Sequence, residues 1–174
     1  MIGVFANVAT VIIGTLIGLL IKKGLPEKIS KAMTTATALA VLYIGIDGMS
    51  AGENTLVLVL SMVVGGVIGT ILNLDGHIQR LGNSIENKFK RSDSNTPIAQ
   101  GFISATLLFC VGAMTIVGAL QSGLSQNHEM QFTKAILDLI SSIVLASTLG
   151  WGVILAAFSV LFLQGSIVLL AQAA

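Results

Sequence analysis

The chain alternates between long apolar runs and short polar patches. Six runs are long enough to cross the hydrocarbon core of a bilayer as helices, which takes about 20 residues each. They cover about residues 1–21, 32–49, 55–74, 97–121, 132–149 and 153–172. The runs show no strand-like alternation, and no cleavage-site pattern follows the first one. The pattern predicts an all-α, polytopic transmembrane bundle that forms a single domain over residues 1–174.

The longest polar stretch, residues 75–100, predicts an amphipathic helix lying on the bilayer surface. Apolar and basic residues recur in it at helical spacing. They are Ile78, Leu81, Ile85 and Phe89, and Arg80, Lys88, Lys90 and Arg91. Pro97 then suits the first turn of the next helix.

The basic residues predict how the chain is oriented. Four lysines flank the loop 22–31, four basic residues occupy the stretch 75–100, and only Lys134 belongs to the opposite side. The positive-inside rule therefore places both of these loops in the cytoplasm and Met1 outside.

Composition agrees with a membrane protein and excludes several partners. Hydrophobic residues make up 54% of the chain and charged residues 10%, compared with roughly 25% charged in a soluble domain. A net charge of +1 and 5% aromatic residues provide no basic, base-stacking surface for nucleic acid. Cys110 is the single cysteine, so it cannot form a disulfide within the chain. No motif for a cofactor or metal is present, and none is expected.

Two aspartates fall inside predicted spans. An ionisable side chain costs roughly 2.5 to 3.5 kcal/mol near the bilayer centre, so an uncompensated one predicts a functional role. With the orientation above, Asp47 and Asp138 both lie in the outer third of the membrane. Two plainer explanations stay open: Lys134 neutralises Asp138 one turn away, and Asp47 reaches interfacial water.

Neutral polar residues of other spans share the outer leaflet. Asn7, Gln121 and Gln164 lie at that depth, and Ser141 extends the face of Asp138. Carboxylates, amides and hydroxyls are hard oxygen donors, which suit cations or protons. We therefore predict a site for an ion or substrate, made of Asp138, Asp47, Gln121, Gln164, Asn7 and Ser141.

Two glycine pairs have the same spacing in two runs that are both directed inward. Gly14 with Gly18 and Gly65 with Gly69 hint at a parallel repeat. The simpler interpretation is that small residues let helix backbones approach each other closely.

The segment 109–121, FCVGAMTIVGALQ, resembles the YqgA/YdfK family of bacterial inner-membrane proteins. The likeness spans nearly the whole chain. It continues through Lys134, Leu137-Asp138, Ser141, Ala146-Ser147, Gly150 and Gln164-Gly165-Ser166, and includes Asn7, Gly14 and Arg80-Leu81-Gly82. The resemblance implies a multi-pass membrane protein of unassigned function for which transport has been suggested, with Asp138 and Gln121 inside its most recognisable motifs.

Two differences from the family pattern affect what is expected. Members continue for one or two more hydrophobic helices beyond a position like Ala174, which implies that this chain is part of a longer protein. Thr70 stands where the family has a glutamate. This weakens the case for a charged site on the third span.

The leading prediction is a transporter or channel for a small solute or ion, linked to cations or protons. It is expected to be a homo-oligomer, because six short helices enclose little volume alone. The alternative is a non-transporting scaffold or partner-binding subunit whose polar residues only hold helices together. An intramembrane enzyme is not expected, because no nucleophile and base can be placed together. A wet cavity lined by Asp47, Gln121, Asp138 and Gln164 would favour transport, and dry pairing of these groups would favour the scaffold.

Overall fold

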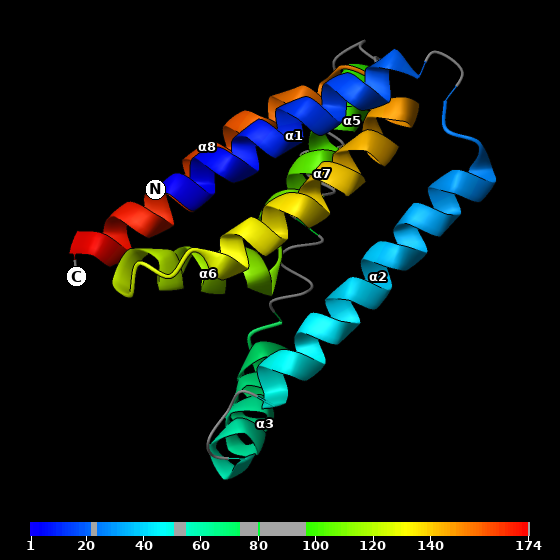
Figure 1. The fold of residues 1–174 in the computed structure, drawn as a ribbon. Coiled ribbons are helices and arrows are strands. Elements are labelled where there is room, and N and C mark those ends of the chain that lie inside the picture. Colours follow the sequence, from blue (N-terminus) through cyan, green and yellow to red (C-terminus); the bar gives the residue numbers. More distant parts are fainter. Residues whose placement is uncertain (22–23, 51–54, 74–79, 81–96, 174) are drawn as a thin grey trace.

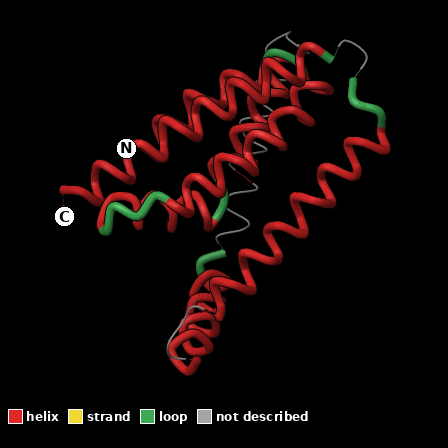
Figure 2. The backbone as a smooth tube through the Cα atoms, in the orientation of Figure 1, coloured by secondary structure: helices red, strands yellow, loops and turns green. Residues whose placement is uncertain are grey.

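The structure is a computed structural model that describes residues 1–21, 24–50, 55–73, 80 and 97–173. This described part is built from α-helices and contains no strand (Figure 2). The helices are α1 (Ile2–Leu20), α2 (Glu27–Ser50), α3 (Thr55–Ile71), α5 (Pro97–Cys110), α6 (Ala113–Leu124), α7 (Glu129–Leu149) and α8 (Gly152–Ala173). The surface helix predicted within residues 75–100 lies outside the described residues, apart from Arg80 and the start of α5.

The prediction of a helical membrane protein is confirmed, and four or five spans are found among the described residues. Four described helices, α1, α2, α7 and α8, are long and apolar enough to cross a membrane, and α5 with α6 makes a fifth if the two count as one bent span. α3 is apolar but has only 17 residues. At 1.5 Å per residue it is roughly 26 Å long, slightly less than a hydrocarbon core of about 30 Å.

Five helices form a bundle. α1 packs along α7 and α8, and α8 also packs on α5 and α6. α1 and α7 run in the same direction and α8 runs in the opposite one, so that both termini lie at one end of the bundle (Figure 1). The largest core cluster joins Phe109 of α5 and Val160 of α8 to Val11 of α1 and Ala146 of α7.

Glycines set the distance between α1 and α7. A Cβ atom at Gly14 would overlap the Ser142 hydroxyl and lie 2.5 Å from the Leu139 carbonyl oxygen. A Cβ atom at Gly18 would lie 2.5 Å from the Ile143 carbonyl oxygen. Both glycines therefore have the small-residue role that the sequence predicted. Gly65 in α3 has nothing within 4 Å of such an atom, so Gly65 does not share this packing role.

The fourth predicted span, residues 97–121, is not one helix. It is divided into α5 and α6, which are bent by 57° relative to each other. Gly112 has extended backbone angles, φ −134° and ψ 148°, and the Thr115 hydroxyl donates a 3.0 Å hydrogen bond to the Phe109 carbonyl oxygen. Glycine weakens a helix by about 1 kcal/mol relative to alanine, and the threonine provides a partner for a carbonyl group at the break.

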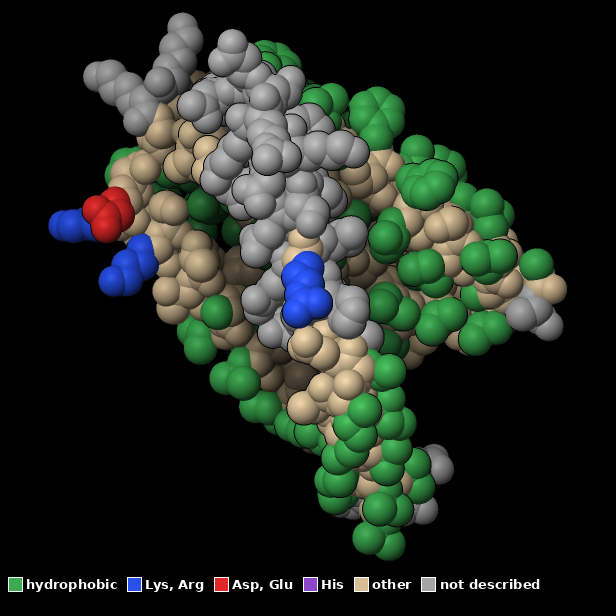
Figure 3. All heavy atoms as spheres, turned by 180° about the vertical axis from the view of Figure 1, so that it is seen from behind, with side chains coloured by type: hydrophobic (Ala, Val, Ile, Leu, Met, Phe, Trp, Pro, Cys, Tyr) green, Lys and Arg blue, Asp and Glu red, His purple; other side chains and the backbone are tan. Residues whose placement is uncertain are grey.

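α2 and α3 are not part of the five-helix bundle. α2 packs on α7, but none of its side chains is buried, and the described side chains of α3 are not buried either. Figure 3 shows hydrophobic side chains over much of the face seen there, including the region of α3 at the bottom of the view. Such a surface fits hydrocarbon better than water.

Replacing Gly14 with leucine should separate α1 from α7 and destabilise the protein. Overpacking costs about 1–3 kcal/mol, which lowers the unfolding temperature by about 5 °C. Cys110 is buried and is the single thiol, so its labelling by a fluorogenic maleimide during heating reports unfolding in detergent. Gly65→Leu is the matched control and should leave the transition in place. Equal shifts for both variants would contradict the packing role of Gly14.

Candidate functional site

Five polar side chains are buried together between helices of the bundle, and we call them the inner polar cluster. They come from α1, α7 and α8, and each is less than 10% exposed. They are Asn7 (α1), Gln131, Lys134 and Asp138 (α7), and Gln164 (α8). Polar groups are seldom buried without a structural or functional reason, particularly in a membrane protein.

The spacing of residues explains why these side chains meet. Gln131, Lys134 and Asp138 follow each other at intervals of three and four residues, which puts them on one face of α7. Gln131 packs against Gly3, and the Asp138 carboxylate interacts with the Asn7 amide one turn further along α1. α1 and α7 thus bring their polar residues together in register.

Lys134 and Asp138 form a buried ion pair through Lys134 Nζ and Asp138 Oδ2. Lysine before an acidic residue is the less favourable order for a helix, so the pair is not a typical surface device for helix stability. Burying two ions costs several kcal/mol per ion, and their attraction offsets this only when the geometry is good. Each charge therefore depends on the other to remain buried.

The amides of the cluster are only partly satisfied. Asn7 Nδ2 donates to Gln164 Oε1 at 3.3 Å. Four buried atoms of the described residues have no hydrogen-bond partner: Asn7 Oδ1, Gln131 Oε1, Gln131 Nε2 and Gln164 Nε2. Turning both amides of the Asn7–Gln164 pair around still leaves one donor and one acceptor free. An unsatisfied buried group costs about 1–3 kcal/mol, so these atoms call for a polar occupant.

The break between α5 and α6 lies near this cluster. Cys110, the last residue of α5, is buried and within electrostatic reach of Lys134 and Asp138. A pocket of about 320 Å³ adjoins the break, and its walls are mostly apolar. It is lined by Cys110, Val111, Gly112, Ala113 and Ile116, and by Leu163 and Ile167 of α8.

The structure brings together three of the six side chains that the sequence grouped, namely Asn7, Asp138 and Gln164. Asp47 is exposed because α2 leaves the bundle, and Gln121 is exposed on α6, beyond the bend. The wet cavity expected between Asp47, Gln121, Asp138 and Gln164 is therefore not formed by these residues.

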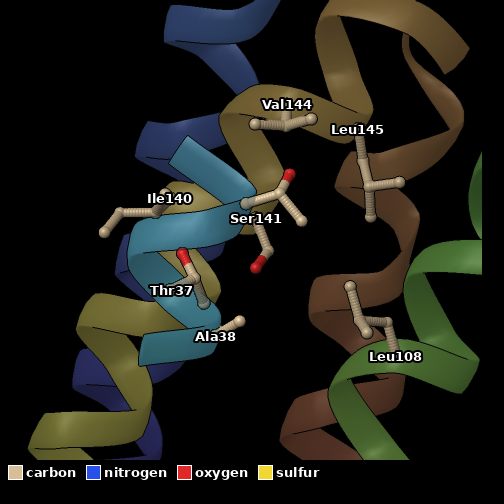
Figure 4. Close-up of a pocket in the computed structure, with 8 residues that line it drawn as sticks. Thr37, Ala38, Leu108, Ile140, Ser141, Val144 and Leu145 are labelled. Atoms are coloured by element: carbon tan, nitrogen blue, oxygen red, sulfur yellow. The ribbon is translucent and has the colours of Figure 1, made fainter. Parts of the chain in front are cut away.

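Ser141 also lies outside the cluster. It is half-buried and points into a second pocket, of about 350 Å³, between α2, α5 and α7 (Figure 4). Leu108 of α5 and Thr37 of α2 face it there. Ser141 follows Asp138 by three residues, an offset of about 60° around the helix axis, and it lies on the side of α7 that faces α2.

Gln131 belongs to the cluster but lies one residue before the predicted span 132–149. α7 begins at Glu129, three residues before the predicted start, so that Gln131 is inside the helix. Its spacing from Lys134 and Asp138 was the available signal. The matching glycines of other helices, Gly3 and Gly118, become apparent only in the structure.

Comparisons with known proteins identify relatives but no function. The model of the family "Protein of unknown function (DUF554)" matches residues 2–174. The uncharacterized membrane protein YdfK of Bacillus subtilis (strain 168) is 34% identical over 176 residues, which cover 99% of this chain and 73% of YdfK. The uncharacterized protein YqgA of Escherichia coli (strain K12) is 29% identical over 166 residues, which cover 94% of this chain and 71% of YqgA.

No solved structure matches the chain. The family match extends over nearly the whole sequence, and the resemblance to YqgA and YdfK is confirmed. The chain belongs to the DUF554 family of proteins of unknown function.

Proposed function

We propose that this membrane protein is a transporter or channel, not an intramembrane enzyme, and that a small solute or ion passes the bundle at the inner polar cluster. The observation that carries the proposal is the set of four buried amide atoms without partners on α1, α7 and α8. Such atoms are stabilised by a polar occupant that can enter and leave.

Packing of the helices against each other does not by itself require this cluster. α1 already packs on α7 through Gly14 and Gly18. Apolar side chains of similar volume often replace a buried ion pair with no loss of stability. Retaining five buried polar side chains is therefore better explained by what they bind.

The broken helix gives separate support. Non-helical backbone at membrane depth is tolerated where it is buried in protein or lines a cavity. Transporters commonly place the ends of discontinuous helices at their binding sites. Gly112 has an extended backbone, and Cys110, two residues before it, is within electrostatic reach of Lys134 and Asp138.

The scaffold is the second candidate. The cavity expected between Asp47, Gln121, Asp138 and Gln164 is not formed, and part of the cluster is internally paired, which is the outcome that the sequence analysis assigned to a scaffold. Lys134 forms an ion pair with Asp138, and Asn7 donates a hydrogen bond to Gln164. The unburied apolar surfaces of α2 and α3 would also accept helices of a partner protein. Internal pairing of this kind is enough for a scaffold. The unpaired amide atoms of Gln131, however, have no role in a scaffold.

The proposal includes an orientation in the bacterial inner membrane, as a homo-oligomer, with loops 22–31 and 75–100 in the cytoplasm and Met1 outside. In a Cys110→Ala background, a membrane-impermeant maleimide should label Ser125→Cys in intact spheroplasts. Glu27→Cys should react only after the membrane is permeabilised. Both side chains are exposed, so a difference in labelling reports the side of the membrane and not burial within the protein. The reverse pattern would contradict this orientation.

Flux into proteoliposomes, measured for a panel of ions and small polar solutes, tests transport. Asp138→Asn should lower the flux of the transported species by at least about tenfold, since the loss of one partner leaves Lys134 uncompensated. Asp47→Asn makes the same chemical change at an exposed position and should keep the wild-type rate. Unchanged flux and unfolding temperature in Asp138→Asn would count against the proposal.

A double variant separates transport from adhesion. Lys134→Met combined with Asp138→Leu removes both charges and keeps the approximate volume, so the protein should unfold within about 5 °C of the wild type. A transporter should nevertheless lose its flux. A scaffold would keep its partners and its stability, and the wild-type protein would show no flux to lose.

A further inference from the structure

The inner polar cluster carries no net charge. Lys134 and Asp138 are its ionisable side chains, and they are bonded to each other. Among the buried residues of the described part, no other side chain is acidic or basic. The electrostatic field at the free amide atoms is therefore that of a dipole and not that of a single charge.

The free atoms are balanced between hydrogen-bond donors and acceptors. Asn7 Oδ1 and Gln131 Oε1 accept, while Gln131 Nε2 and Gln164 Nε2 donate. A bare cation would find two free amide oxygens and the Asp138 carboxylate, which is already paired with Lys134; this is fewer than the six to eight oxygens of a hard cation site. An anion would find two free amide donors and the Lys134 ammonium group, which is already paired with Asp138. Neither type of ion uses the whole set.

Gln131 contributes one donor and one acceptor, and glycines on two helices hold its side chain. A Cβ atom at Gly3 would lie 2.7 Å from Gln131 Cβ, and one at Gly118 would lie 3.4 Å from Gln131 Cγ. The amide is thus held between α1 and α6 with few alternative rotamers. Fixing a polar group in advance lowers the entropy lost when it binds a ligand.

We propose that the cluster binds a small uncharged solute that both donates and accepts hydrogen bonds, and that Gln131 is its main binding residue. This rests on the transport function proposed above and names its substrate class. Urea and glycerol are suitable probes, because each is uncharged, is only a few atoms in size and carries donors and acceptors. Na⁺, K⁺ and Cl⁻ are the corresponding ionic probes.

The experiment uses the full chain in proteoliposomes and follows osmotic swelling by light scattering in stopped flow. Wild type should raise urea or glycerol permeability above that of empty liposomes. Gln131→Met should lower this increment by about fivefold to tenfold, since it removes both hydrogen-bonding atoms and preserves the length of the side chain. Gln121→Met is the matched control, because it makes the same change at an exposed position of α6 and should not alter permeability.

Stability measurements keep the result interpretable. Gln131→Met removes two buried polar atoms without partners, so its unfolding temperature should equal or exceed that of the wild type. If it fails to fold, Gln131→Glu replaces the donor by an acceptor with the same shape, and should also lower urea or glycerol permeability. Normal permeability in a folded Gln131 variant overturns the assignment, as does an equal loss in Gln121→Met.

The ionic arm separates this inference from the proposed function. Flux of Na⁺, K⁺ or Cl⁻ that depends on Asp138, without urea or glycerol permeation, would leave transport standing and overturn the uncharged substrate class. If neither solutes nor ions pass through folded wild-type protein, both proposals are overturned.

Discussion

The close parallel packing of α1 on α7 is the constraint on which the site depends. Gly3, Gly14 and Gly18 leave no room for side chains between the two helices. At this separation α1 covers the face of α7 that carries Lys134 and Asp138, and the pair is shielded from lipid. A wider separation would leave a charged pair beside hydrocarbon, where charges are costly. The ion pair therefore depends on the glycines. Each charge needs its partner, and the pair as a whole needs α1 packed closely over it.

Much of this arrangement follows from the sequence. Run length predicted the helical fold, the glycine spacing predicted the role of Gly14 and Gly18, and helical periodicity put Lys134 next to Asp138. The break at Gly112 was not predicted, because 97–121 is predominantly apolar and hydropathy contains no information on bends. Glycine occurs in straight transmembrane helices as well, so its presence alone does not locate a break.

The grouping of Asp47 and Gln121 with Asp138 failed for a different reason. Depth along a span can be estimated from sequence, but the direction in which a side chain points around the bundle depends on packing. α2 contributes no buried residue, so Asp47 is exposed whatever its depth, and the bend exposes Gln121. Gln131 shows the opposite case, a residue that the sequence left out of the site and the structure includes. Because α7 begins three residues before the predicted span, Gln131 lies inside the helix and is buried.

The broken helix and the uncharged cluster are consistent with each other. A helix end offers free backbone N–H or C=O groups, so that the C-terminus of α5 is partially negative and the N-terminus of α6 partially positive. These two helix ends meet at Val111 and Gly112. Seen from a distance their opposite partial charges largely cancel, but nearby the backbone groups of the two ends can still donate and accept hydrogen bonds. The side chains of Lys134 and Asp138 likewise carry opposite charges that cancel at a distance. A region that combines both features presents many hydrogen-bonding groups and little net field, which favours a polar molecule without charge over an ion.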